Sequence, residues 1–399
     1  MPIEATVLSS SHSGDSRLIA LHRPPTPESG SMTNTSHPHI TVQVSPHCKS
    51  DQERDALLSN LRFGSVFTDH MVTIRWVDGA WQQGELKAFG PLHLSPATST
   101  LHYAQSIFEG LKAYRHADGK IVTFRPTMNA RRFAASARRL AMPELPEERF
   151  IEAIEALVQQ DRAWVPSAPG TSLYLRPLMF ATEASLGVKP ANEYLTVVFA
   201  SPAGAYFASG SAPVKLWVTR DHVRAAPHGT GSAKCGGNYA ASLLAQAQAK
   251  EKGCDQVLYL DAIERKFIEE LGGMNFFAVL RSGQSPRLVT PDLSSGTLLA
   301  GVTRDSILKL AADMGYKVEE RPISLDELRS AYADGSLQEA FACGTAAVVT
   351  AIGSISGDFG TIKLNEKQSG PVTDSLYQEL YGIQCGTKPD RHGWLHRIC

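Results

Sequence analysis

The sequence has few cysteines, and they form no pattern. Its six cysteines lie far apart, with no C-x-x-C pair, at Cys48, Cys235, Cys254, Cys343, Cys385 and Cys399. A disulfide framework or a structural zinc site would need more regular or closer spacing. We therefore expect an intracellular protein without a metal site.

Long hydrophobic runs and an excess of charge are also absent. No apolar stretch approaches the roughly 20 residues that a membrane helix requires. Lysine plus arginine total 39 against 40 for aspartate plus glutamate, and no long basic run occurs. Neither a membrane nor a nucleic acid is therefore expected as a partner, and a small molecule is.

The N-terminal segment lacks a hydrophobic period. It is rich in serine, threonine, proline and histidine, and its first 45 residues hold two arginines and three acidic residues. This composition favours a disordered extension over residues 1–50 and does not match an arginine-rich, acid-poor transit peptide. We expect a cytoplasmic protein and leave import into a mitochondrion open.

The remaining chain is long enough for two domains with cores of their own, with 399 residues in all and 43% of them hydrophobic. Residues 51–200 alternate strand-like runs with two amphipathic helices, which predicts a small N-terminal domain with a mixed sheet. Residues 201–213 are rich in glycine, alanine, serine and proline and indicate a linker. Residues 214–399 predict a larger C-terminal domain, so the fold class is α/β with mixed sheets.

Two helix predictions depend on local signals. Leu101–Gly110 resembles a short helix stopped by glycine, and an alanine-rich helix is expected from about Asn238 to Lys252.

Lys234 stands among glycines and small residues just ahead of this alanine-rich stretch. A phosphate-binding P-loop would need glycine before the lysine and serine or threonine after it, but Ala233 and Cys235 stand there. The dinucleotide fingerprint fails as well, because the lysine replaces a required glycine. A structural lysine remains the default, and a Schiff-base lysine becomes attractive if the chain supplies partners for a ring nitrogen and a phosphate.

Candidates for both partners occur later in the chain. Glu270 lies in an apolar strand, where burial of a carboxylate without a cationic partner would be costly. The alternative is an exposed strand residue, since Glu269 beside it must face the opposite side. The helix entered through Gly301 offers free N–H groups, and Gly344-Thr345 forms a second small-residue turn.

Nine segments in the same order resemble those of branched-chain amino-acid aminotransferases, which have fold type IV among pyridoxal-phosphate enzymes. The segments are Phe67–His70, Leu101–Tyr103, Phe108–Tyr114, Ser172–Pro177, Ser185–Val188, Gly236–Tyr239, Glu270–Asn275, Gly301–Val302 and Phe341–Ala346. The resemblance extends from Phe63 to Gly386, about four-fifths of the chain. It implies two domains with pyridoxal 5′-phosphate at their interface, and a homodimer with shared active sites.

The resemblance also implies the catalytic residues. Lys234 would form the Schiff base with the cofactor and carry the proton between the substrate α-carbon and the cofactor. Glu270 would keep the pyridine nitrogen protonated, and Tyr239 would hydrogen-bond the phenolic oxygen. From the residues alone, Tyr239 would be taken for a partly buried helix aromatic.

Further cofactor contacts follow from the same resemblance. Arg132 would pair with the phosphate, Val302 and Thr303 would give it their N–H groups, and Thr345 its hydroxyl. Gly273 would lie beside the cofactor, where eukaryotic members often have threonine, so one hydroxyl is missing there.

The implied substrate site accepts branched-chain amino acids and 2-oxo acids. The carboxylate would meet N–H groups of the turn at Thr345, Ala346 and Ala347. Ala347 and Thr350 stand where mammalian members carry a C-x-x-C pair. Thiol regulation through that pair is therefore not expected.

The implied side-chain pocket combines apolar residues with one cation. Arg176 would bind the distal carboxylate of 2-oxoglutarate. Phe63, Phe108 and Tyr174 would line the pocket, with Tyr103 and Val188 lent by the neighbouring subunit.

We therefore expect transfer of the amino group of L-leucine, L-isoleucine and L-valine to 2-oxoglutarate. The alternatives are a D-amino-acid or amine transaminase, an aminodeoxychorismate lyase of the same fold, or a protein that binds a cofactor or metabolite without catalysis.

Overall fold

Short β-rich runs and amphipathic stretches form two mixed sheets with helices in the computed structural model, which describes residues 39–204, 212–282 and 285–399. Within these residues the first sheet has ten strands. They are β1 (Ile40–Val42), β2 (His70–Val77), β3 (Ala80–Trp81), β4 (Gly84–Ala88), β5 (Ser106–Phe108), β6 (Leu111–Arg115), β7 (Ile121–Phe124), β8 (Ser172–Ala181), β9 (Tyr194–Ala203) and β19 (Leu395–Arg397). The main path runs β1-β4-β2-β9-β8-β6-β7-β19.

The hairpins of this sheet follow from turn chemistry. Strands β2 and β3 pair Val77 with Ala80 around Asp78 and Gly79, which both have positive φ, at 54° and 74°. A two-residue turn with two positive φ values matches the twist of the flanking strands. The Asp78-Gly79 pair therefore accounts for a hairpin at this position.

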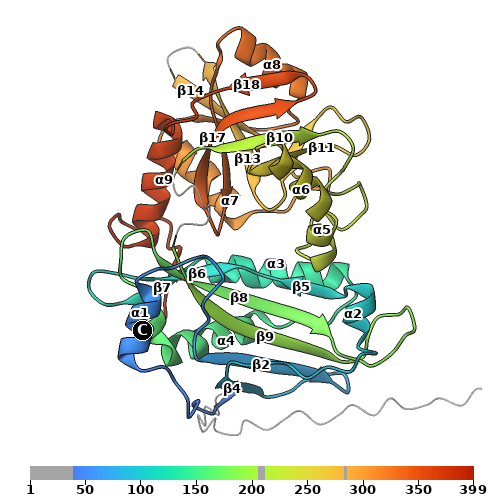
Figure 1. Cartoon of the computed structure of the whole chain (residues 1–399). Coiled ribbons are helices and arrows are strands. Elements are labelled where there is room, and N and C mark those ends of the chain that lie inside the picture. The colour runs from blue at the N-terminus through green and yellow to red at the C-terminus, as the bar shows by residue number, and fades with distance from the viewer. Residues whose placement is uncertain (1–38, 205–211, 283–284) are drawn as a thin grey trace, which may run out of the picture. The chain divides into compact units, whose positions relative to one another are not determined.

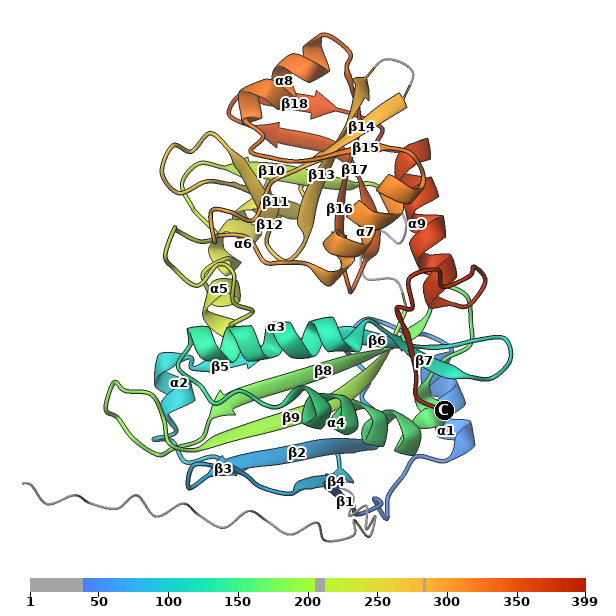
Figure 2. The same ribbon diagram turned by 180° about the vertical axis from the view of Figure 1, so that it is seen from behind.

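Two helices cover one face of the first sheet (Figures 1 and 2). They are α3 (Pro126–Arg139) and α4 (Glu147–Gln160). Phe133 and Phe150, one from each helix, lie with their ring centroids 5.4 Å apart in the core beneath them. The opposite face carries a second apolar cluster, with Met71, Phe180 and Val197 at its centre.

The second sheet has nine strands within the described residues. They are β10 (Val214–Thr219), β11 (Gln256–Leu260), β12 (Ile268–Leu271), β13 (Asn275–Ser282), β14 (Ser285–Thr290), β15 (Lys317–Glu320), β16 (Leu337–Gly344), β17 (Val348–Gly357) and β18 (Gly360–Lys363). The main path runs β12-β11-β10-β17-β16-β13-β14-β15.

The other helices are short or pack on the second sheet. They are α1 (Asp51–Leu58), α2 (Ser99–Tyr103), the 3₁₀ turn η1 (Arg162–Trp164), α5 (Gly236–Ala240), α6 (Leu243–Glu251), α7 (Val302–Asp313), α8 (Leu325–Ala333) and α9 (Pro371–Gln384). Helices α7 and α9 pack on β16. In the described part of the chain no helix is both long and apolar enough to span a bilayer.

Two helix predictions were wrong in part. The helix expected over Leu101–Gly110 ends at Tyr103, because Ala104 adopts a left-handed conformation, and β5 follows. The helix expected from Asn238 to Lys252 is divided into α5 and α6 at residues 241–242. Long-range pairing of β5 with β8 decides the first case.

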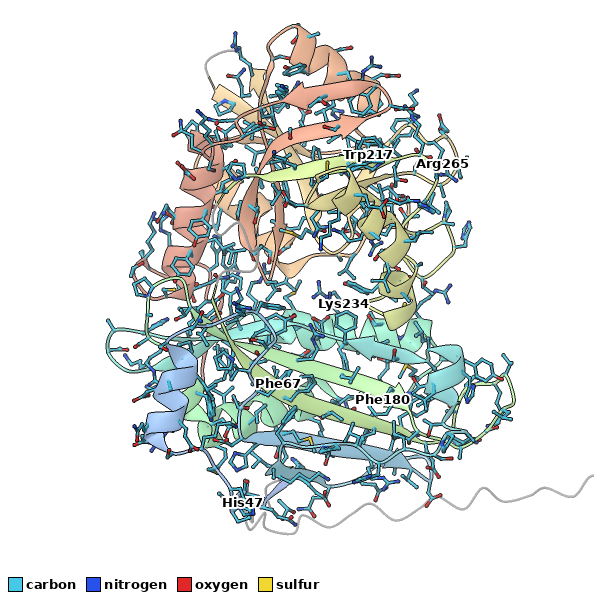
Figure 3. All side chains as sticks on the ribbon, viewed as in Figure 1. His47, Phe67, Phe180, Trp217, Lys234 and Arg265 are labelled. Carbon is cyan, nitrogen blue, oxygen red and sulfur yellow. The ribbon has the colours of Figure 1, made fainter. Side chains whose placement is uncertain are left out.

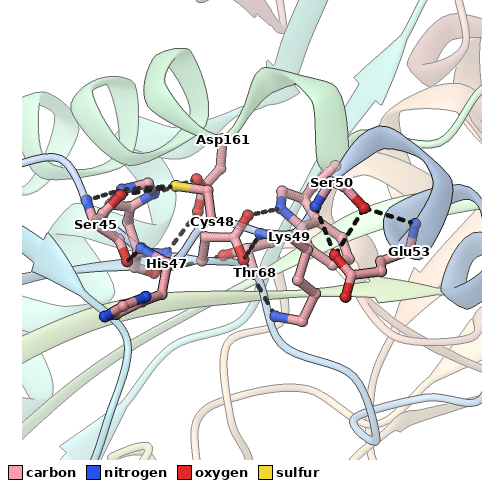
Figure 4. Close-up of polar contacts among 11 residues, drawn as sticks. Ser45, His47, Cys48, Lys49, Ser50, Glu53, Thr68 and Asp161 are labelled. Atoms are coloured by element: carbon pink, nitrogen blue, oxygen red, sulfur yellow. Dashed lines mark hydrogen bonds and ion pairs between the residues drawn. The ribbon is translucent and has the colours of Figure 1, made fainter.

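The expected N-terminal extension of residues 1–50 is structured from residue 39 onward, and its first 38 residues lie outside the described part. Strand β1 pairs in parallel with β4. Figure 4 shows the polar contacts of the following segment, where Ser45 donates its N–H to His70 Nε2 at 2.9 Å and Ser50 caps α1. His70 Nδ1 lies 2.6 Å from the buried carboxylate of Asp161.

The expected linker over residues 201–213 is shorter than its composition indicates. Residues 201–203 belong to β9, and residues 205–211 lie outside the described part. At the other end of the chain, β19 returns to the first sheet and pairs with β7, so the last residues join the sheet of the N-terminal half.

Candidate active site

Lys234 lies on an irregular segment that contacts both halves of the chain (Figure 3). Its carbonyl accepts the N–H of Phe108 at 3.0 Å, and its own N–H donates to Ser136 Oγ at 2.9 Å. Asn238, in α5, donates to the carbonyl of Ala233 at 2.9 Å. These bonds fix the backbone on either side of Lys234.

The Lys234 ammonium lies in a desolvated, mixed electrostatic environment. Burial, followed by the positive charge of Arg132, lowers its pKa to about 8, although Glu109 opposes this shift. Its Nζ lies 2.8 Å from the Tyr239 hydroxyl, whose own pKa is raised by burial to about 12. With this pKa about a tenth of the molecules carry a neutral Lys234 at pH 7, a far larger share than for an ordinary lysine, and the neutral form can act as a nucleophile.

Glu270 is 2% exposed and has an ordered set of hydrogen-bond donors. Its Oε1 accepts the N–H of Leu299 and lies 2.9 Å from Arg224, and its Oε2 accepts from Asn275 Nδ2 at 2.8 Å. Burial raises the pKa of this carboxyl, and Arg224 is the largest opposing influence. The remaining acceptor capacity of Oε2 suits a protonated ring nitrogen.

Arg132 connects the first sheet with the start of α7. Its guanidinium makes a bidentate pair with Glu109 at 2.7 and 2.8 Å and donates to the carbonyl of Ala300 at 3.0 Å. Helix α7 follows directly, with Gly301 as an N-cap that has no side-chain hydrogen bond. The free N–H groups of the first turn and the nearby arginine form an electropositive position that suits a phosphate.

One cavity brings most of the predicted site residues together. Those that line it are Phe63, Phe108, Arg132, Tyr174, Arg176, Lys234, Tyr239, Glu270, Gly273, Val302, Thr303, Thr345 and Ala346. The cavity thus holds an amine, a carboxylate and an electropositive helix start beside aromatic rings. Such a set suits a flat ring that carries a basic nitrogen and a phosphate.

Three predicted substrate residues lie outside this cavity. Ala347 lines an adjacent cavity, which shares Ala346 with the first. Val188 is 85% exposed, and Tyr103 is also exposed, with its hydroxyl 2.5 Å from the Leu186 carbonyl. The latter two were expected to serve a neighbouring subunit, and this stays a prediction.

Sequence reasoning missed three residues that arrange the site: Glu109, Arg224 and Asn275. Glu109 has no exposed surface and pairs with Arg132, which more than offsets the effect of burial and keeps the pKa of this carboxyl below its usual value. A carboxylate between apolar residues is a signal for a buried pair. The apolar sequence around Glu270 also predicted that it needs a cationic partner. The sequence did not identify that partner, because Arg224 stands far away along the chain.

The comparisons with known proteins agree with this geometry. The Amino-transferase class IV family matches residues 106–355. A probable branched-chain-amino-acid aminotransferase of Streptomyces coelicolor is 56% identical, over 90% of this chain and 99% of the relative. The branched-chain-amino-acid aminotransferase of Mycolicibacterium smegmatis is 53% identical, over 92% and 100%.

Solved structures give the same result. The branched-chain amino acid aminotransferase of Escherichia coli has a TM-score of 0.68 at 30% identity, over 82% of this chain and 99% of that one. A T.th. branched-chain amino acid aminotransferase with pyridoxamine 5′-phosphate has a TM-score of 0.67 at 30% identity, over 82% and 98%. The chain therefore belongs to the branched-chain-amino-acid aminotransferases, a group of pyridoxal-phosphate-dependent transaminases within amino-transferase class IV.

Proposed function

We propose that the protein reversibly transfers the amino group of L-leucine, L-isoleucine and L-valine to 2-oxoglutarate, which yields L-glutamate and branched-chain 2-oxo acids. The observation that carries this proposal is the position of Lys234 in one cavity with Glu270, Arg132 and the start of α7. The names of the relatives at 53–56% identity support the same substrates.

The residues present fit pyridoxal phosphate. Glu270 retains acceptor capacity although three donors already orient it, and the first turn of α7 has no side-chain cap. When bound, this group supplies an electrophilic carbon and a protonated ring that withdraws electrons from the substrate α-carbon. Glu270 would hold the ring proton, and Arg132, Val302, Thr303 and Thr345 would hold the phosphate.

Lys234 and Tyr239 would handle the reacting protons. The lowered pKa of Lys234 favours the neutral amine, so its Nζ would hold the electrophilic carbon of the cofactor. Once the substrate amine has replaced it there, the freed Nζ would take the proton from the substrate α-carbon. Tyr239 lies within hydrogen-bond distance of Nζ and would orient it. A Cβ added at Gly273 would lie 3.7 Å from the Tyr239 ring. A larger side chain at this position would therefore narrow the space beside the tyrosine.

The aromatic wall would accept aliphatic side chains, and one arginine would accept the second substrate. Phe63 and Tyr174 meet edge to face at 4.9 Å. Arg176 lies over the rings of Phe108 and Tyr174, and its Nε has no hydrogen-bond partner in the described part of the chain. A guanidinium with a spare donor is suited to the distal carboxylate of 2-oxoglutarate.

We also propose a homodimer in which Tyr103 and Val188 complete the partner's site. The exposure of both residues supports this. A small domain of residues 51–200, whose sheet β1 and β19 also join, and a large domain over most of residues 214–399 are part of the same proposal. A cytoplasmic location stays a prediction, with mitochondrial import open.

Two measurements test the function. The purified protein should show the absorbance band of a lysine-bound pyridoxal group, and Lys234→Ala should lose it. A panel of L- and D-amino acids and amines with 2-oxoglutarate should then give activity with leucine, isoleucine and valine. A colourless wild type would disprove the cofactor assignment, and activity confined to D-alanine or amines would disprove the substrates.

A further inference from the structure

Lys112 is a buried ammonium to which the described residues offer no carboxylate partner. It lies on β6 opposite Tyr174 of β8 and is 7% exposed. Within the described residues it forms no ion pair, and its Nζ donates a hydrogen bond to the carbonyl of Ala346 at 2.7 Å. Burial lowers its pKa to about 8. An unpaired buried cation is costly and calls for an explanation.

The bond ends on the hairpin turn that joins β16 and β17. Gly344 pairs with Val348, so residues 345–347 form the turn. Val348 has a φ of 62°, a left-handed conformation that a β-branched residue rarely adopts. Strain of this kind persists only where surrounding contacts impose it, and it is often found at ligand sites. The hydrogen bond from Lys112 restrains the same turn, two residues before Val348.

The bond also fixes which way one peptide unit faces. In a planar trans peptide the C=O and the following N–H point in opposite directions. Because the Ala346 oxygen is held toward Lys112, the N–H of Ala347 points the other way. A carbonyl oxygen free to turn would repel a carboxylate at this place, whereas an N–H would bind it.

We propose that Lys112 is a positioning residue for substrate binding: it holds the turn at residues 345–347 so that its N–H groups face the substrate α-carboxylate, and it supplies positive charge behind them. The proposal rests on the proposed function, because it assigns the turn to the carboxylate of amino and 2-oxo acids. It explains why no carboxylate among the described residues pairs with Lys112, since an ion pair would cancel the charge that attracts the substrate.

The variant Lys112→Met tests this in the holoenzyme. Methionine keeps most of the length and removes both the charge and the donor. Because the buried ammonium is itself costly, we expect the variant to fold and to unfold in urea at no lower concentration than the wild type. The cofactor absorbance and the affinity for the cofactor should stay unchanged.

Binding of 4-methylvalerate, which has the leucine skeleton without its amino group, reports on the carboxylate directly. We expect Lys112→Met to weaken it about 10- to 100-fold, and to raise the KM for both leucine and 2-oxoglutarate by similar factors with a smaller change in kcat. Lys112→Arg should restore most of the affinity. Lys120→Met, on the exposed turn between β6 and β7, is the matched control and should behave as the wild type.

3-Methylbutylamine, the leucine skeleton without the carboxylate, separates the proposal from a general effect on the site. Its single-turnover rate should be the same in the wild type and in Lys112→Met. Equal 4-methylvalerate affinity in both proteins, or an equal loss for the carboxylate-free amine, would overturn the role of Lys112. Failure of the wild type to bind 4-methylvalerate or to use leucine would instead refute the proposed function.

Discussion

Arg224 is the residue that most strongly favours the ionised form of Glu270 against the effect of burial. The two side chains are both 3% exposed and lie 2.9 Å apart. We predict that Arg224→Met destabilises the fold by about 3–5 kcal/mol, because it leaves an uncompensated buried carboxylate. The pKa of Glu270, already raised by burial, should rise further, so that the ring nitrogen loses its anionic partner and kcat falls roughly 10- to 100-fold.

Guanidinium denaturation and steady-state rates measure these effects. Arg224→Lys keeps a positive charge, so its stability and its kcat should lie between those of Arg224→Met and those of the wild type. Arg220→Met, which removes an exposed arginine paired with Asp358, is the control and should change neither quantity. A fully active and stable Arg224→Met protein would contradict the assignment.

Lys234 carries a cost for stability that its chemistry requires. Its folded pKa of about 8 lies below the ordinary 10.5. Between these values the unfolded chain binds more protons than the folded one, so this group makes stability rise with pH there, and below pH 8 the full penalty remains. We predict that the cofactor-free Lys234→Met protein is more stable than the cofactor-free parent at pH 7, by on the order of 1–3 kcal/mol.

Urea denaturation of the two cofactor-free proteins at pH 7 and at pH 10 checks this prediction. The advantage of the methionine variant should shrink at the higher pH. An advantage that grows with pH, or a less stable variant at pH 7, would mean that burial does not lower the pKa of Lys234.

At this scale the sequence revealed residues whose chemistry needs a special setting, but not their partners. Glycines around Lys234 and the apolar neighbours of Glu270 are local features, so both were predictable. Arg224 and Glu109 meet their partners only through the pairing of distant segments. Nothing near Arg224 in sequence distinguishes it from a surface charge, and the apolar neighbours of Glu109 indicate burial without indicating that Arg132 is its partner.

The start of α7 depends on a glycine for space and not for its backbone conformation. A Cβ at Gly301 would lie 2.1 Å from Asn275 Oδ1, and Asn275 donates to both Glu270 and the Leu299 carbonyl. We predict that Gly301→Ala displaces Asn275, costs about 1–3 kcal/mol of stability, and weakens cofactor binding roughly 10- to 100-fold. Titration of the cofactor-free protein with pyridoxal phosphate measures the affinity.

Gly90→Ala is the control for this substitution. Its added Cβ would meet no atom within 4 Å, and its φ is not positive. Unchanged cofactor affinity in Gly301→Ala would show that the contact between Gly301 and Asn275 does not support the site.

Elements with local signals were predictable, and elements decided by pairing were not. The hairpin at Asp78–Gly79 and the amphipathic α4 follow from turn residues and helical periodicity. The residues of strand β5 were predicted to continue the preceding helix, but they pair with β8 instead. Strand β19 is three residues long and depends wholly on β7, 271 positions earlier when Leu395 is compared with Phe124.

At the scale of the whole molecule, active sites that two subunits share would require an exposed apolar surface near Tyr103. Leu186 and Val188 are 67% and 85% exposed on the loop beside Tyr103, and apolar side chains exposed together indicate an interaction surface. The resemblance supplied the idea of a partner subunit. Composition and periodicity could not predict this surface, because it forms only when α2 and the loop before β9 come together.

Subunit mixing tests whether Tyr103 acts in the partner's site. We predict that Tyr103→Ala lowers kcat/KM at least about tenfold and that Lys234→Ala is inactive. After the two proteins are mixed in equal amounts and exchange subunits, half of the dimers are hybrids, each with one site that has both Lys234 and Tyr103. Activity should therefore rise to about a quarter of the wild-type value. If Tyr103 served its own chain, every site with Lys234 would still lack it, and mixing would produce no gain.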